Sequence, residues 1–204
     1  MHPRSVDREP IMTIEADLLD TVVAPEPGGI ELVGAEAIPV EEAEASLWAL
    51  DDLDLHAAGL TTLHAGMLQI AIGQYRQGVV EQPLGSNRGV PLTRYVQWFA
   101  PRSGPVPWCA YFVSWCLDRA TDSNRRVPWT NPGYVGSVKA WAAGAGRLVS
   151  RPQQGDIFGL SDQHIGIVNN ASAGAGQITT IEGNFSDKVA AVRRSTSGLW
   201  FARI

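Results

Sequence analysis

The chain has 204 residues, of which 45% are hydrophobic, and this is enough apolar material for one folded domain with additional sequence. Residues 1–62 contain fourteen Asp/Glu and two Arg, whereas residues 63–204 contain fourteen Lys/Arg and seven Asp/Glu. No uncharged apolar stretch is long enough to span a bilayer, which excludes a transmembrane protein and favours a soluble one made in a cytoplasm.

The acidic segment, residues 1–60, is expected to be a flexible leader or linker. Its stretch "VVAPEPGGIELVGAEAIPVEEAEA" combines prolines, glycines and carboxylates without a sustained helical or alternating period. An alternative is that this acidic arm shields a basic site until a partner displaces it. The first twenty residues lack an apolar run flanked by basic residues, so no secretory signal is expected. We therefore expect the folded domain to span residues 61–204.

From residue 60 onward the pattern is first helical and then strand-like. Helices are predicted from about residue 60 to 77, around "LTRYVQWFA", from about residue 107 to 120, and around "VGSVKAWAAG". Beyond residue 150, short segments rich in Ile, Val and Phe predict antiparallel strands: "GDIFGL", "HIGIVNNA", "QITTIEGN", "KVAAVRRS" and "LWFARI". Helices followed by strands predict an α+β fold.

The chain has two cysteines, Cys109 and Cys116, in the stretch "GPVPWCAYFVSWCL". On one helix they lie about 10 Å apart, too far for a disulfide, which excludes an extracellular disulfide framework. Cys116 is predicted in mid-helix as a structural thiol. Cys109 is predicted in the first turn, where unpaired N–H groups and the helix dipole favour a thiolate and could bind an oxyanion. Cys109 is therefore a candidate nucleophile, although on its own a structural thiol is the commoner case.

A thiol nucleophile needs a base, and His164 has the most suggestive surroundings. It opens the strand "HIGIV" with Gly166 on the same face, which leaves room for another chain to approach. On the next strand Glu182 and Asn184 are two residues apart, so both are predicted on one face and either could orient the imidazole. A cysteine at a helix head, a histidine and a neighbouring polar group form an arrangement for nucleophilic catalysis. Surface or capping roles are expected for the other histidines: His2, His56 and His64.

Four blocks in this order resemble the CHAP family of cysteine, histidine-dependent amidohydrolases and peptidases: "GSNRG", "PWCAYFVSW", "GDIFGLSDQHIGIV" and "TTIEGNFSD". The resemblance covers roughly residues 65–204. It implies a papain-like fold, with N-terminal helices packed on a C-terminal antiparallel sheet. It also implies Cys109 as the nucleophile, His164 as the general base, and Glu182 with Asn184 as the supporting polar groups.

The resemblance implies a peptidoglycan hydrolase that cleaves an amide bond, either an N-acetylmuramoyl-L-alanine amidase or a stem or cross-link endopeptidase. Asn87, Arg88 and Trp108 are expected to bind the substrate. No cofactor is expected, and the residues around Cys109 lack the aspartate cluster of a calcium loop, so no metal is expected. The expected place of action is the bacterial cell wall, for a phage lysin, a virion-associated protein or a delivered effector. Virion or secretion-machine components would then be further partners.

Three other functions compete with this interpretation. One is a cysteine protease or acyltransferase acting on another substrate. Another is a catalytically idle structural protein of a virion or cell surface, against which the intact Cys/His/Glu/Asn set argues. The third is a nucleic-acid-binding module, but the arginines are scattered and no aromatic–basic motif occurs, so no nucleic-acid partner is expected.

Overall fold

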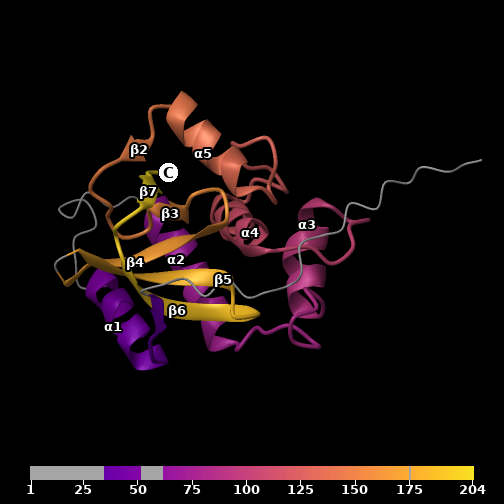
Figure 1. The fold of residues 1–204 in the computed structure, drawn as a ribbon, viewed down its shortest axis with the longest axis horizontal. Coiled ribbons are helices and arrows are strands. Elements are labelled where there is room, and N and C mark those ends of the chain that lie inside the picture. Colours follow the sequence, from indigo (N-terminus) through magenta and orange to yellow (C-terminus); the bar gives the residue numbers. More distant parts are fainter. Residues whose placement is uncertain (1–34, 52–61, 175) are drawn as a thin grey trace, which may run out of the picture.

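The computed structural model describes residues 35–51, 62–174 and 176–204 (Figure 1). Helices precede most of the strands, which confirms the predicted α+β, papain-like fold class. In chain order the elements are β1 (Ala35–Ala37), α1 (Val40–Asp51), α2 (Thr62–Arg76), the π-helix η1 (Pro91–Val96), α3 (Gln97–Phe99), α4 (Cys109–Thr121), α5 (Val135–Gly144), β2 (Leu148–Val149), β3 (Ile157–Leu160), β4 (His164–Gly174), β5 (Gln177–Phe185), β6 (Lys188–Ser195) and β7 (Leu199–Ala202).

The strands of the described residues form one antiparallel sheet in the order β1-β6-β5-β4-β3-β7-β2. Strands β3 to β6 follow one another as a meander, and β7 then pairs with the free side of β3. Ile157 pairs with Ile167, which pairs with Ile181, so a row of buried isoleucines crosses three strands. This row packs in the same core as the helices, while the residues that alternate with it point to the opposite face.

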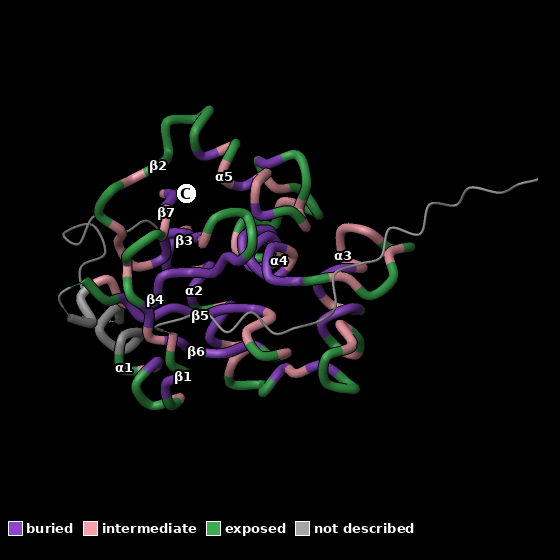
Figure 2. Tube along the Cα trace, in the orientation of Figure 1, coloured by how far each residue is buried: buried purple, intermediate pink, exposed green. Residues whose placement is uncertain are grey.

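Helices α2 and α4 pack against one face of the sheet, and the buried residues follow α4 and the central strands (Figure 2). Apolar residues spaced three and four apart form the stripe of α4 that meets the sheet: Cys109, Phe112, Val113 and Cys116. Met67 and Leu68 of α2 complete the contact and are fully buried. Within the described ranges, no helix is both long and apolar enough to cross a membrane.

Residues 35–51 belong to the folded domain, although the sequence places them in the acidic leader. Strand β1 pairs with β6, and Ile38 and Ala43 are buried in the core. The Asn169 side chain donates a hydrogen bond to the Ala43 carbonyl at 3.0 Å, and the Tyr75 hydroxyl donates to the Ile38 carbonyl at 2.8 Å. The domain therefore extends beyond the expected boundary at residue 61, at least to residue 35. The remainder of the expected leader, residues 1–34 and 52–60, lies outside the described residues.

Candidate active site

Cys109 is the first residue of α4, at the position that the sequence predicts for it. Its thiol is free and the residue is 6% exposed. Trp108 precedes the helix and provides no side-chain cap. Because the first-turn N–H groups of a helix have no partner within the helix, those of α4 can bind an anion.

Cys116 lies seven residues further along α4 and is fully buried. Burial raises the pKa of the Cys116 thiol well above its ordinary value, which keeps the thiol protonated. Cys116 is therefore a core side chain, and Cys109 is the cysteine that can act as a nucleophile.

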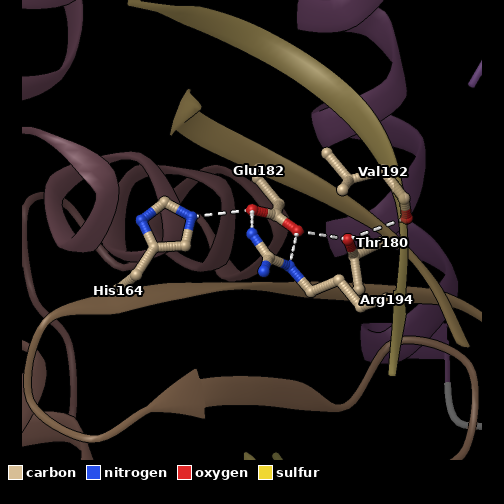
Figure 3. Close-up of polar contacts among 5 residues, drawn as sticks. All are labelled: His164, Thr180, Glu182, Val192 and Arg194. Atoms are coloured by element: carbon tan, nitrogen blue, oxygen red, sulfur yellow. Dashed lines mark hydrogen bonds and ion pairs between the residues drawn. The ribbon is translucent and has the colours of Figure 1, made fainter. Parts of the chain in front are cut away.

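His164 opens β4 and points one ring nitrogen at Glu182 on β5 (Figure 3). The His164 Nε2 and Glu182 Oε2 atoms are 2.7 Å apart, and the Cys109 side chain is a second hydrogen-bonding partner of the imidazole. Burial alone would lower the pKa of His164, but Cys109 and Glu182 together raise it from 6.5 to about 9. The imidazole is therefore protonated at neutral pH.

Glu182 is fully buried, and its carboxylate contacts two further side chains besides His164 (Figure 3). Oε1 accepts hydrogen bonds from Arg194 Nε and from the Thr180 hydroxyl, both at 2.5 Å, and Oε2 accepts one from Arg194 Nη2 at 2.5 Å. Burial would raise the pKa of Glu182, but Arg194 and His164 lower it from 4.5 to about 2. The buried negative charge is thus paired and fully hydrogen-bonded.

The sheet register brings these groups to one face. Val168 pairs with Thr180, and Ile178 pairs with Arg194. Since alternate residues of a strand share a face, four side chains lie on the side opposite the isoleucine row: His164, Thr180, Glu182 and Arg194.

Two glycines allow the close approach of the groups in the site. A Cβ atom on Gly166 would lie 2.9 Å from Glu182 Cγ, so this glycine makes room for the carboxylate. A Cβ atom on Gly183 would lie 2.5 Å from Phe112 Cβ, so this glycine lets the first turns of α4 pack directly on β5. Together they bring the helix that carries Cys109 and the carboxylate that holds His164 to adjoining positions.

Asn184 does not share the face of Glu182, contrary to the expectation from their spacing. The β5–β6 register shifts between Glu182 and Phe185, and Asn184 has a left-handed backbone with a φ of 61°. Its side-chain amide lies 3.5 Å from the Asn87 Oδ1 atom instead. The carboxylate that contacts His164 is therefore Glu182, whereas the bulge in β5 places Asn184 beside Asn87.

The three expected substrate-binding residues lie in two different environments. Asn87 is half-buried and Arg88 is exposed, both in loop 82–88, where a substrate could reach them. Trp108 is fully buried and donates its indole N–H to Glu81 at 2.7 Å. Trp108 is therefore bound to the residue that precedes the loop, and its ring is packed in the core and has no exposed surface for a substrate.

The sequence interpretation missed Thr180, Arg194 and Glu81. Arg194 looked like one of several scattered arginines in "KVAAVRRS". A signal was present, because a carboxylate predicted in a buried strand needs a cation, and the neighbouring strand of the hairpin carries one. Among residues 35–51, 62–174 and 176–204, no three His, Cys, Asp or Glu side chains are grouped as ligands of a metal ion.

Comparison with protein families agrees with the geometry. Residues 101–184 match the family described as CHAP domain, and this range includes Cys109, His164 and Glu182. Comparisons with curated proteins and with solved structures give no match. CHAP domains are cysteine, histidine-dependent amidohydrolases and peptidases, and the cysteine at the head of α4 faces the histidine of β4 as such chemistry requires. Residues 101–184 are therefore similar to the CHAP domain, the family that the sequence motifs resemble.

Proposed function

We propose that this protein is a peptidoglycan hydrolase that cleaves an amide bond at the bacterial cell wall through a thioester on Cys109. The observation that carries the proposal is the connected series Cys109, His164 and Glu182 at the uncapped head of α4. The CHAP domain supports a peptidoglycan substrate. The excess of Lys and Arg in residues 63–204 suits an anionic wall polymer.

The first half of the reaction forms the thioester. With its proton held by His164, the Cys109 sulfur attacks the carbonyl carbon of the scissile amide as a thiolate. The first-turn N–H groups of α4 bind the oxyanion that develops. His164 then donates its proton to the leaving nitrogen, the C–N bond breaks, and an acyl group remains on the sulfur.

The second half of the reaction releases the acyl group. Water attacks the thioester, His164 accepts the proton from that water, and the Cys109 thiolate leaves. Glu182 accepts the hydrogen bond from the His164 Nε2–H in both halves of the reaction and stabilises the imidazolium. The other ring nitrogen, Nδ1, is then available to Cys109. Arg194 and Thr180 keep the carboxylate in place.

Digestion of purified peptidoglycan, followed by mass spectrometry of the released fragments, tests the proposal and identifies the bond. An amidase releases complete stem peptides from intact glycan strands, whereas an endopeptidase leaves shortened or unlinked stems on the glycan. We expect one of these patterns with the native protein and none with Cys109→Ala. Unchanged peptidoglycan after incubation with the native protein would contradict the proposal and favour another acyl substrate or an idle site.

A further inference from the structure

Glu81 is a buried carboxylate that the proposed chemistry does not use. It is 2% exposed and directly precedes loop 82–88. Its Oε1 atom accepts the indole N–H of Trp108 at 2.7 Å, and its Oε2 atom accepts the backbone N–H of Asn87 at 2.6 Å. These donors belong to two separate segments, the residue before the nucleophile and the loop expected to meet the substrate.

The Trp108 contact fixes the head of the nucleophile helix. Trp108 is fully buried, and its ring stacks on Tyr95 with 5.5 Å between the ring centroids. Its carbonyl accepts the Phe112 N–H at 2.8 Å, inside the first turn that begins with Cys109. Trp108 therefore links Glu81, through its indole, to the first turn of α4, through its backbone carbonyl.

The Asn87 contact fixes the loop. Asn87 has a left-handed backbone with a φ of 52°, which Oε2 of Glu81 stabilises by accepting its N–H. The backbone N–H of Glu81 donates to the Asp187 carbonyl at 2.9 Å, so the same residue is also tied to the turn between β5 and β6. As a result the amides of Asn87 and Asn184 meet at 3.5 Å, one from the loop and one from the end of β5.

We propose that Glu81 is a positioning residue that fastens loop 82–88 to the head of α4 and holds the Asn87–Asn184 amide pair to bind the peptide part of the substrate. The inference rests on the proposed function. Primary amides donate and accept hydrogen bonds as peptide groups do, so the pair suits a stem peptide. Only a carboxylate accepts two N–H donors on its two oxygens. In Glu81→Gln, one of the two oxygens is replaced by an NH2 group, which cannot accept a hydrogen bond, so one of those N–H donors loses its acceptor.

Asp118 provides a matched control on the same helix. It is 2% exposed and accepts the Trp98 indole N–H at 2.8 Å and the Arg125 backbone N–H at 2.6 Å, so its contacts resemble those of Glu81 in kind. It lies nine residues beyond Cys109, about 13 Å along the helix. Asp118→Asn is expected to lower the thermal midpoint while leaving the rate of peptidoglycan hydrolysis unchanged.

Three measurements on the full chain, all made well below the unfolding transition, test the role of Glu81. They are the rate of peptidoglycan hydrolysis at limiting substrate, hydrogen exchange of the amides of residues 82–88, and alkylation of Cys109 by iodoacetamide. We expect Glu81→Gln to slow hydrolysis and to accelerate loop exchange by about tenfold each, since one buried charged hydrogen bond is lost. Alkylation of Cys109 should change by a smaller factor than loop exchange, because Glu81 reaches the first turn of α4 only through Trp108, whereas it contacts Asn87 directly. Asn87→Asp keeps the backbone N–H and a side chain that tolerates the left-handed backbone but loses the amide donor, so it should slow hydrolysis without accelerating loop exchange.

Unchanged loop exchange in Glu81→Gln would overturn the inference. Equal effects of Glu81→Gln and Asp118→Asn on hydrolysis would also overturn it, because both residues would then act only on stability. If Glu81→Gln fails to fold, Trp108→Phe removes the N–H donor while keeping an aromatic ring, and it should shift loop exchange in the same direction. Hydrogen exchange needs no turnover, so an inactive native protein would refute the proposed function while the exchange data still decide the role of Glu81.

Discussion

At the scale of the residue, the described part of the chain contains two histidine–carboxylate–arginine clusters, and the one with His164 and Glu182 is buried throughout. In the other, His64 Nε2 lies 3.3 Å from Asp156 Oδ1, and Arg203 Nη2 lies 3.1 Å from Asp156 Oδ2. That cluster ties α2 to the beginning of β3 and to the residue after β7. The imidazole of the His164 cluster has Cys109 as a partner, and this is the cluster to which we assign the catalytic role.

We expect Glu182→Gln to lower the hydrolytic rate by at least about 100-fold and Asn184→Ala by less, because Glu182 contacts the imidazole and stabilises its charge. Steady-state kinetics on peptidoglycan measure both. Asp156→Asn is the control, and at temperatures where it is folded it should keep the native rate. Glu182→Gln leaves the Arg194 cation buried without a counter-ion. The double variant Glu182→Gln/Arg194→Met removes both charges, and measuring it as well separates a loss of catalysis from a loss of the fold. A larger effect from Asn184→Ala would make Asn184 the orienting group.

The pKa shifts predict a pH window for the free energy of unfolding. The pKa of His164 is raised from 6.5 to about 9, so its contribution to stability is complete below pH 6.5 and is lost as the pH rises towards 9. The pKa of Glu182 is lowered from 4.5 to about 2, so its contribution is complete above pH 4.5 and is lost as the pH falls towards 2. Urea unfolding of the native protein and of His164→Gln should therefore diverge most between pH 4.5 and 6.5. Parallel stability profiles of the two proteins would contradict the assigned charges.

At the scale of the element, the spacing between α4 and β5 depends on a residue without a side chain. Gly183→Ala places a Cβ atom 2.5 Å from Phe112 Cβ, so α4 must shift and the distance between Cys109 and His164 must change. We expect the hydrolytic rate to fall by at least about tenfold, as misplacement of reacting groups by about 1 Å can cost 100-fold. The control is Gly73→Ala on α2, where the new Cβ atom meets nothing within 4 Å and alanine favours the helix by about 0.5–1 kcal/mol. Native activity in Gly183→Ala would show that the packing of α4 on β5 tolerates displacement.

Elements with a clear period were predictable, and short or irregular ones were not. The helix Val135–Gly144 and the strand Lys188–Ser195 coincide with the predicted segments, since their apolar residues recur at helical or strand spacing. Strands β1 and β2 have three and two residues, which is too short for any period to appear. The predicted face of Asn184 differs from the observed one for a related reason, because side chains alternate along a strand only until a bulge shifts the register. The contact between Arg194 and Glu182 depends on the register of β5 and β6, which single-strand patterns do not contain.

At the scale of the whole molecule, the acidic and basic parts of the sequence do not correspond to a leader and a domain. The exposed carboxylates of α1 form ion pairs with basic residues of the domain: Glu42 with Arg193, and Glu44 with Arg76. Such exposed pairs add little stability, so the attachment of this segment depends on the burial of Ile38 and Ala43. The excess of negative charge in residues 1–62 therefore gives no domain boundary.

We expect a protein that begins at residue 35 to fold, and one that begins at residue 61 to lose stability and aggregate. Burial of the Ile38 side chain contributes about 2 kcal/mol to the free energy of unfolding, and this contribution is lost when the residue is removed. The loss of β1 also exposes the edge of β6. Chemical unfolding and size-exclusion chromatography of both proteins measure this difference. If the protein that begins at residue 61 is monomeric and as stable as the full chain, the boundary near residue 60 is correct and residues 35–51 are dispensable.

The central claim is that Cys109 is the nucleophile, and a comparison of cysteine variants tests it most directly. The rate at which purified peptidoglycan is hydrolysed would be measured for the native protein, Cys109→Ala and Cys116→Ala. Removal of a nucleophile that acts as a unit with its base should lower the rate by at least about 1,000-fold, so Cys109→Ala should be inactive while retaining the native fold. Cys116→Ala should lose some thermal stability because it leaves a small cavity in the core, yet it should keep its activity. A folded Cys109→Ala protein that hydrolyses peptidoglycan at the native rate would contradict the account.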